Sequence, residues 1–374
     1  MQNPTEKLNI LISCGSYSWG GLEMISLETA NKLRERGTNV KILCSKGSRL
    51  EDEAKNRGFE TVPVFGKNKN IPSSIIELKN YLKDSNIDVI HSNHSHDLWV
   101  ITPALNLSGS KAKLFLTKHM ASGVKKNDLF HRYLYKRVNK VFAISNYIKS
   151  SVKNTTPVKE EIIVLLPVGI DLKRFDRNKY DPIEIKKTLG LPEDKIIIGI
   201  AGRMTPGKGH EEFLEAARIL NDEFPEKLFF LVIGNASFGE EKYEEGILRL
   251  SEALGSQNIK FTGYTSEPEK MMTVLDVLSF PSHDESFGRV LLEAMALGIP
   301  TAASGYAGVL DITIENETGL LFEPKNANSQ AEALSKLIKD DELREKFSLN
   351  GKKRAEEVFT FDIMTDNLIE LYKK

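Results

Sequence analysis

Two glutamates separated by seven residues, Glu285 and Glu293, stand in the stretch PSHDESFGRVLLEAMALGIP, residues 281–300. Phe287 and Gly288 lie where a loop turns into an apolar helix that ends at a glycine. If the helix begins near Gly288, its free N–H groups and its dipole favour an anion. The two carboxylates can then reach opposite ends of an extended, polyhydroxylated ligand. The alternative, two solvated glutamates on a surface helix, fits poorly with the apolar surroundings.

A basic turn, GRMTPGKGH at residues 202–210, joins a buried strand to a helix. Arg203 and Lys208 bracket its Pro-Gly pair. Two cations at the carboxyl end of a strand suit a diphosphate, because charge-assisted hydrogen bonds to phosphate are strong. The P-loop spacing G-x-x-x-x-G-K-[ST] is absent. A basic turn on its own is most often a solvated loop, so this interpretation depends on the other motifs.

Glycines also precede the first helix. Gly20 and Gly21 end the loop after the first apolar run, and they allow a phosphate or a sugar ring close to the backbone. The loop does not match the dinucleotide fingerprint G-x-G-x-x-G, which argues against NAD or FAD. His91, His94 and His96 form the run HSNHSHD, but no fourth ligand accompanies them. We therefore expect a strand-end loop there and no metal site.

The elements that position these residues alternate between strand and helix. Continuous apolar runs separated by amphipathic stretches indicate parallel sheets covered by helices on both faces. The predicted strands are 8–13, 40–45, 88–92, 113–118, 141–145 and 162–167 in the first half, and 195–202, 228–234, 259–263, 277–282 and 300–304 in the second.

The first predicted strand of each half is followed by a glycine-bearing loop and an amphipathic helix, the opening of a doubly wound domain. With 374 residues the chain is long enough for two such domains. We expect an α/β fold with two Rossmann-like domains, residues 1–180 and 181–359, joined through the polar segment 176–192. The final helix, within 360–374, is expected to pack back on the first domain. A ligand would bind in a cleft between the domains.

The two halves carry opposite charge. Residues 1–180 hold 29 Lys and Arg against 17 Asp and Glu, a net charge of +12, whereas residues 181–374 hold 22 against 35, a net charge of −13. A basic half can face an anionic membrane, an acidic saccharide or nucleic acid. Alternatively, the opposite charges merely help the halves attract one another. No nucleic-acid-binding module accompanies the charge, so we expect no nucleic acid partner.

Six of the cations fall in KKNDLFHRYLYKRVNK, residues 125–140, together with Phe130 and Tyr133. This segment suits anionic lipid or an acidic acceptor, with the rings as anchors, or it is a solvated helix with buried aromatics. No apolar run is long enough to span a bilayer, and the N-terminus does not resemble a signal peptide. We expect a cytoplasmic protein with peripheral contact at the inner membrane face. Cys14 and Cys44 are expected to be buried free thiols.

Many short stretches, in this order and combination, resemble the family 4 glycosyltransferases, the large retaining group with the two-Rossmann-domain fold called GT-B. The resemblance runs nearly end to end and is strongest over residues 195–324. Where the family often has a glycine, in IGNG or IGDG, this chain has Ala236 and Ser237, which leaves the conformation of that loop open. The resemblance is carried by GGLE (20–23), DVIHSNH (88–94), TKHM (117–120), AISNYIKSSV (143–152), VGIDLKRF (168–175), GRMTPGKG (202–209), IGNASFGEE (233–241), FTGY (261–264), SHDESFGRVLLEAMALGIP (282–300) and TGLLFEP (318–324).

The resemblance implies how a nucleotide-sugar donor is held. Arg203 and Lys208 would neutralise its diphosphate. Glu285 would bind the sugar hydroxyls, and Glu293 would bind the ribose. Further contacts would come from the backbone at Phe287, Gly288 and Arg289, from Gly20 and Gly21 on the phosphate side, from Gly263 and Tyr264 at the base, and from His119, which would face the transferred sugar.

The implied reaction is retaining transfer of a hexose-type sugar from a UDP-sugar, or from GDP-mannose, to a saccharide or lipid-linked acceptor of an envelope glycan. Two cations and a helix N-terminus would stabilise the leaving diphosphate without a metal or other cofactor. The D-x-D triplet of metal-dependent transferases is absent from the chain. The alternatives are a sugar-nucleotide epimerase or phosphorylase, or a non-catalytic sugar-nucleotide-binding protein. The joint presence of the predicted catalytic residues, Glu285, Arg203, Lys208 and His119, weighs against binding alone.

Overall fold

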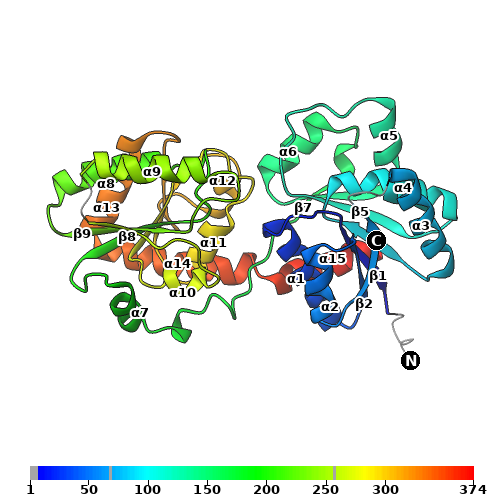
Figure 1. Ribbon diagram of the computed structural model, residues 1–374, viewed down its shortest axis with the longest axis horizontal. Helices are drawn as coiled ribbons and strands as arrows, with labels where there is room; N and C mark the ends of the chain where they lie inside the picture. Colours follow the sequence, from blue (N-terminus) through cyan, green and yellow to red (C-terminus); the bar gives the residue numbers. More distant parts are fainter. Residues whose placement is uncertain (1–6, 67–69, 256–257) are drawn as a thin grey trace. The chain divides into compact units, whose positions relative to one another are not determined.

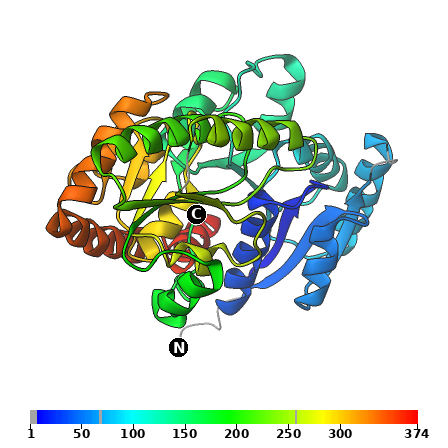
Figure 2. The ribbon, with the colours of Figure 1, turned by 60° about the vertical axis from the view of Figure 1, so that its left-hand side comes forward.

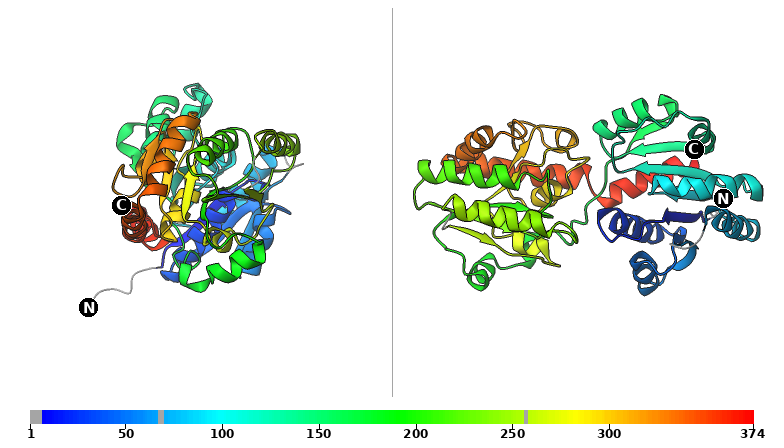
Figure 3. Two further views of the ribbon diagram at one scale, coloured as in Figure 1. Left: turned by 90° about the vertical axis from the view of Figure 1, so that its left-hand side faces the viewer. Right: turned by 45° about the horizontal axis from the view of Figure 1, so that its top comes forward.

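The computed structural model describes residues 7–66, 70–255 and 258–374. The chain divides into two compact units, one formed by Met1–Gly169 with Phe361–Lys374 and the other by Ile170–Thr360 (Figure 1). Each unit is a parallel sheet with helices on both of its faces (Figure 3). The doubly wound α/β architecture predicted from the sequence is therefore confirmed. The segment 176–192 lies within the second unit.

The sheet of the first unit has seven parallel strands in the order β3-β2-β1-β4-β5-β6-β7. Ile10, Leu11 and Ile12 of β1 are fully buried, as expected for a strand covered on both faces. Cys14 and Cys44 lie side by side in β1 and β2 as buried free thiols, as predicted. The strands are β1 (Asn9–Cys14), β2 (Asn39–Ser45), β3 (Glu60–Phe65), β4 (Val89–Ser92), β5 (Lys113–Lys118), β6 (Val138–Ala143) and β7 (Ile163–Leu165). The helices are α1 (Gly21–Glu35), α2 (Arg49–Asn56), α3 (Ile71–Asp84), α4 (Leu98–Ser108), α5 (Leu129–Lys136), α6 (Asn146–Thr155) and α15 (Phe361–Lys373), with short 3-10 turns η1 (Ser95–Asp97) and η2 (Glu160–Ile162).

The sheet of the second unit has six parallel strands in the order β10-β9-β8-β11-β12-β13. The helices and strands of this unit, coloured from green to orange, are seen from a second direction in Figure 2. Its strands are β8 (Ile196–Ala201), β9 (Leu228–Ile233), β10 (Ile259–Phe261), β11 (Val277–Phe280), β12 (Thr301–Ser304) and β13 (Leu320–Phe322). Its helices are α7 (Pro182–Leu189), α8 (His210–Glu223), α9 (Glu241–Ala253), α10 (Pro268–Met272), α11 (Arg289–Ala296), α12 (Val309–Ile312), α13 (Ala327–Lys339) and α14 (Asp341–Val358), preceded by the 3-10 turn η3 (Arg177–Lys179).

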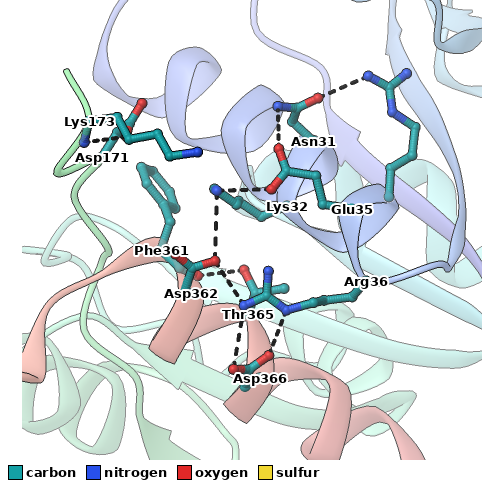
Figure 4. A network of polar contacts seen from close by, with 11 residues as sticks. Asn31, Lys32, Glu35, Arg36, Asp171, Lys173, Phe361, Asp362, Thr365 and Asp366 are labelled. Atoms are coloured by element: carbon teal, nitrogen blue, oxygen red, sulfur yellow. Dashed lines mark hydrogen bonds and ion pairs between the residues drawn. The ribbon is translucent and has the colours of Figure 1, made fainter.

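The last helix, α15, packs on the first unit. Its apolar side joins the core formed by β1, β2 and α1, and Tyr372 is fully buried there. On its polar side Arg36, the residue that follows α1, forms ion pairs with Asp362 at 2.8 Å and with Asp366 at 2.9 Å (Figure 4). Lys32 lies 3.7 Å from Asp362 as well. The chain therefore returns to complete the unit in which it began.

In each sheet the chain order reverses beside the strand that comes first in the sequence. β1 lies between β2 and β4, and β8 lies between β9 and β11. The loops that leave such neighbouring strands turn to opposite faces, which opens a crevice at their carboxyl ends, and ligands of open α/β sheets bind there. Within the described ranges, no helix combines the length and the apolar composition needed to cross a bilayer.

Candidate functional site

Most of the predicted site residues gather at the carboxyl ends of the strands in the second sheet. Arg203 and Lys208 follow β8, Gly263 and Tyr264 follow β10, and the stretch 285–289 follows β11. Because parallel strands end at one edge of a sheet, loops distant in the sequence meet at this edge.

Lys208 and Glu285 form an ion pair between the loops after β8 and β11, the two strands on either side of the point of reversal. Lys208 Nζ donates to Glu285 Oε2 over 2.6 Å. The two side chains are 32% and 19% exposed, so the pair is partly shielded and still open to a ligand. Ser282 Oγ lies 3.4 Å from the same carboxylate oxygen. The predicted phosphate-binding and sugar-binding groups are therefore direct neighbours.

The two loops that carry this ion pair are fastened to each other by backbone contacts. The His283 amide donates to the Gly207 carbonyl at 2.9 Å. Gly209 has φ +78°, and a Cβ at this position would lie 2.3 Å from the Pro281 carbonyl oxygen. Both the conformation and the space therefore require glycine. Contacts between backbone atoms therefore hold the two loops together.

Arg203 is exposed and reaches toward the loop after β9. Its Nη1 donates to Ser237 Oγ at 3.4 Å. That loop starts at Gly234, whose φ is +123°, and a Cβ there would lie 2.0 Å from the Gly202 carbonyl oxygen. Ala236 and Ser237, which stand where the family often has a glycine, thus follow Gly234, where both the conformation and the space require a glycine. The Ser237 hydroxyl accepts the hydrogen bond from Arg203.

The start of α11 has the form predicted for an anion site. Gly288 adopts φ +101° and immediately precedes Arg289, the first residue of this eight-residue helix. The first amides of a helix have no acceptor within it and can bind an anion. Phe287 is 3% exposed and packs edge-on against Phe359, with ring centroids 5.9 Å apart. Its side chain is therefore part of the core and is not available to a ligand.

Glu293 lies on the buried side of α11 and is 9% exposed. Its Oε1 accepts a hydrogen bond from Arg289 Nη2 at 3.3 Å. Burial raises the pKa of Glu293, although the charges of Arg289 and Arg174 oppose this. Arg174 is itself bound to Glu269 at 2.8 Å. The alternative of a solvated surface glutamate is therefore wrong for Glu293.

Gly263 and Tyr264 form the turn after the edge strand β10. Gly263 has φ +71°, and its backbone pairs with that of Gly234. Tyr264 is 77% exposed, so its ring is accessible for stacking.

In the first unit Gly20 is the N-cap of α1, and its amide donates to Glu23 Oε2 at 2.8 Å. The backbone at Gly20 is extended, a conformation that any residue can adopt. The contribution of this glycine is therefore the space left by its missing side chain. Gly21 is the first residue of α1. His119 follows β5, and its Nε2 lies 3.1 Å from Oδ1 of Asn93, which follows β4.

Sequence reasoning missed a buried carboxylate at the point of reversal in the first sheet. Asp97 is 3% exposed and accepts hydrogen bonds from the Ser13 hydroxyl at 2.6 Å and the Gly15 amide at 2.9 Å. It also lies 2.9 Å from His94 Nδ1, and this hydrogen bond raises the pKa of His94. No local sequence pattern signals this role, because the partners of Asp97 lie in β1, in the loop after β1 and in its own loop.

Lys118, beside the predicted His119, was also missed. It is 7% exposed, and its Nζ donates to Ser95 Oγ at 2.8 Å. Burial lowers the pKa of Lys118 to about 8, and the charge of Lys126 contributes.

The histidine cluster divides between core and loop. His91 lies within β4, where its ring nitrogens contact the hydroxyls of Tyr372 and Thr117, and burial lowers its pKa to about 3. Only His94 and His96 lie beyond the strand, with ring centroids 6.0 Å apart. The strand-end interpretation is therefore corrected for His91. Across the three described ranges, no group of three or more His, Cys, Asp or Glu side chains is arranged to hold a metal ion.

Two family models match this chain one after the other. The model described as Glycosyltransferase Family 4 matches residues 19–174, and that described as Glycosyl transferases group 1 matches residues 181–354. The chain belongs to glycosyltransferase family 4. Members of this family are retaining hexosyltransferases, so the chain is an enzyme of that class.

Two relatives of this family 4 glycosyltransferase match it over most of its length. It is 28% identical over 365 residues to the capsular polysaccharide biosynthesis glycosyltransferase CapM of Staphylococcus aureus, with 91% of each chain covered. It is 25% identical over 394 residues to a D-inositol 3-phosphate glycosyltransferase of Stackebrandtia nassauensis, which covers 96% of this chain and 87% of that protein.

Solved structures establish the fold of the glycosyltransferase. A glycosyltransferase from Rickettsia africae superposes with a TM-score of 0.87 at 22% identity, covering 98% of both chains. HepE of Anabaena, crystallised with UDP-glucose, superposes with a TM-score of 0.83 at 20% identity, covering 98% of this chain and 99% of that one. The GT-B fold expected from the sequence is confirmed.

Proposed function

We propose that this glycosyltransferase moves a hexose-type sugar from UDP to a saccharide or lipid-linked acceptor of an envelope glycan, with GDP-mannose as the second donor candidate. The ion pair of Lys208 and Glu285 carries the proposal. In a nucleotide sugar the phosphate and the transferred sugar are covalently adjacent. A cation and a carboxylate 2.6 Å apart match that adjacency, because the lysine can neutralise phosphate while the glutamate accepts hydrogen bonds from sugar hydroxyls.

The remaining donor contacts follow from the same edge of the second sheet. Arg203 and the amides at Gly288 and Arg289 bind the diphosphate, together with the backbone at Phe287. Glu293 accepts hydrogen bonds from the ribose. The exposed ring of Tyr264 stacks on the base beside the turn at Gly263. For Gly20, Gly21 and His119 of the first unit, the donor contacts implied by the family resemblance stay predictions.

The proposed chemistry needs no protein nucleophile. The acceptor oxygen attacks the anomeric carbon on the face from which the diphosphate departs, and its proton passes to the leaving phosphate oxygen. One carbon–oxygen bond forms as the other breaks, so the configuration is retained. The negative charge that develops on the diphosphate is stabilised by Arg203, Lys208 and the start of α11.

Two kinds of relative support the donor and the pathway. HepE of Anabaena was crystallised with UDP and glucose, and CapM of Staphylococcus aureus acts in capsular polysaccharide biosynthesis. The basic charge of residues 1–180 suits an anionic membrane face or an acidic glycan, so we place the enzyme at the cytoplasmic side of the membrane.

A calorimetric screen with UDP, GDP and ADP tests the donor. We expect UDP to bind tightest, by about tenfold or more. The favoured nucleotide sugar, labelled in its sugar, is then incubated with acceptor extracts, with and without a chelator, which should leave transfer unchanged. Preference for GDP would replace the UDP assignment. Conversion of the donor to an isomer without transfer would indicate an epimerase, and binding without any reaction would indicate a binding protein.

A further inference from the structure

The first unit contains a groove lined only by apolar and aromatic residues of α3, α4 and α5. These three helices are labelled in Figure 1. The volume of the groove is about 450 Å³. The lining includes Ile71 and Ile75 of α3, Trp99 and Pro103 of α4, and Leu129 and Phe130 of α5. All three helices follow strands at the carboxyl edge of the sheet, and half of the lining residues lie in their first turns. The groove therefore lies toward the edge that also carries His119.

The apolar side chains of the groove remain open to water in this unit. Leu129 is 84% exposed, Phe130 is 69% exposed and Ile71 is 40% exposed. Trp99 and Phe130 stack with ring centroids 6.3 Å apart. Contiguous exposed apolar side chains are costly for a water-soluble surface and usually mark a binding site. The predicted alternative for this segment, a helix with buried aromatics, is therefore wrong for Phe130.

The chain segment that carries α4 and α5, two of the three helices of the groove, is strongly cationic. Residues 98–159 contain twelve Lys and Arg and one acidic residue, Asp128. The carboxylate of Asp128 accepts hydrogen bonds from the first amides of α5 and contacts His131. A second groove beside α5 is lined in part by three cations, Arg132, Lys136 and Lys159, and by one carboxylate, Glu161. An occupant with an apolar body and an anionic end complements both features.

We propose that the groove takes up a hydrocarbon chain of an anionic lipid, while the cations beside α5 bind its headgroup. A hydrocarbon chain requires no hydrogen-bond partner, and the lining offers almost none. A peptide in the same place would bury backbone amides and carbonyls without partners, which is costly. The inference extends the proposed function, in which the acceptor is lipid-linked or lies at a membrane, and it adds a lipid-chain site within the first unit.

Trp99 is a built-in probe of this groove. The chain has two tryptophans, so Trp19→Phe leaves Trp99 as the single one. Vesicles of phosphatidylglycerol with brominated acyl chains should quench Trp99 fluorescence, because bromine quenches only on close approach. Vesicles of brominated phosphatidylcholine should quench it much less, since they lack the anionic headgroup.

Variants of exposed groove residues distinguish binding of a lipid chain in the groove from general electrostatic attraction to the vesicle surface. Leu129→Ser with Phe130→Ser should weaken vesicle partitioning about tenfold and remove the quenching, because two apolar side chains are lost. Ile76→Ser is the control, since Ile76 lies on α3, one of the three helices of the groove, and is 56% exposed but is not part of the lining. It should change neither measurement. Circular dichroism melting confirms that each variant is folded.

Binding to phosphatidylglycerol without quenching of Trp99, or equal quenching by phosphatidylcholine, would overturn the inference. UDP-sugar turnover is measured on the same samples. Turnover without quenching would contradict the lipid-chain site alone. Quenching without any turnover would contradict the proposed function alone.

Discussion

At the residue scale, the ion pair of Lys208 and Glu285 determines what removal of the lysine should do. Lys208→Ala removes a phosphate ligand and leaves the carboxylate unpaired beside the diphosphate. We expect kcat/KM to fall about 10²- to 10³-fold, or roughly 2.7–4 kcal/mol of transition-state stabilisation. Arg203→Ala should lose activity in the same direction. Lys187→Ala, an exposed lysine of α7, is the control. Normal kcat/KM in a folded Lys208→Ala variant would contradict the phosphate assignment.

Replacement of Glu285 and of Glu293 by glutamine should impair two different properties of the enzyme, sugar transfer and nucleotide binding. Glu285→Gln should impair sugar transfer while sparing the affinity for free UDP, because the sugar is absent from UDP. Glu293→Gln should weaken the binding of UDP itself, since it alters the ribose contact. Titration calorimetry with UDP distinguishes the two variants. Equal losses of UDP affinity would show that the assigned roles are incorrect.

The burial of Glu293 also predicts a stability effect. The pKa of this carboxyl is raised in the folded state, so the folded protein binds more protons than the unfolded chain between the two pKa values. The stability contributed by Glu293 therefore falls as pH rises through that interval. Glu293→Gln should raise the free energy of unfolding at neutral pH, and by less at about pH 4, near the ordinary glutamate pKa. Thermal unfolding at both pH values tests this, and a loss of stability at neutral pH would mean that the Arg289 interaction dominates.

The chemistry of single residues was partly readable from the sequence. Arg203, Lys208 and Glu285 stand after strongly apolar runs, so their placement at one sheet edge followed from the parallel topology. Asp97 could not be found in this way, because its importance lies in partners from β1 and its own loop that no local pattern connects. The pairing of Lys208 with Glu285 is likewise a contact between loops 77 residues apart.

At the scale of elements, the close approach of the β8–α8 and β11–α11 loops predicts unequal costs for two glycine substitutions. Gly207 and Gly209 both have positive φ, but a Cβ on Gly207 would meet no atom within 4 Å. Gly207→Ala should cost about 1–2 kcal/mol from backbone strain alone. Gly209→Ala should cost about 2 kcal/mol more, because the Pro281 carbonyl must move. Chemical denaturation measures both, and equal costs would show that the loops separate easily.

The elements missed by sequence reasoning are edge strands. β3 and β13 each have a neighbour on one side only. β3 contains Pro63, which has no backbone N–H to donate and is tolerated at such an edge. Because of this proline, the run ETVPVF was not predicted as a strand. β13 has only three residues, Leu320–Phe322. Central strands were predicted because burial on both faces makes them continuously apolar. For the segment 125–140, one predicted alternative was a single helix. In the structure only Leu129–Lys136 is helical, and β6 begins at Val138.

At the scale of the whole molecule, the charge asymmetry predicts a salt-dependent attraction to anionic membranes. Residues 1–180 carry +12, and each cation near an anionic surface contributes about 1 kcal/mol at low salt. Replacing Lys125, Lys126, Arg132 and Lys136 by Gln should reduce co-sedimentation with phosphatidylglycerol vesicles while leaving donor hydrolysis unchanged. Binding should decline along a salt series. Absence of binding even at low salt would favour an acidic soluble acceptor.

The return of α15 to the first unit has a consequence for biosynthesis. Residues 361–374 supply Phe361, Met364, Leu368 and Tyr372 to the core around β1 and β2. During translation the second unit, a continuous segment, is complete before these residues leave the ribosome, and domains fold as units once their residues are available. The first unit, although synthesised first, must wait with part of its core uncovered. The order of synthesis and the order of completion are thus opposite, and the newly made chain depends on its last helix to close the unit with which it began.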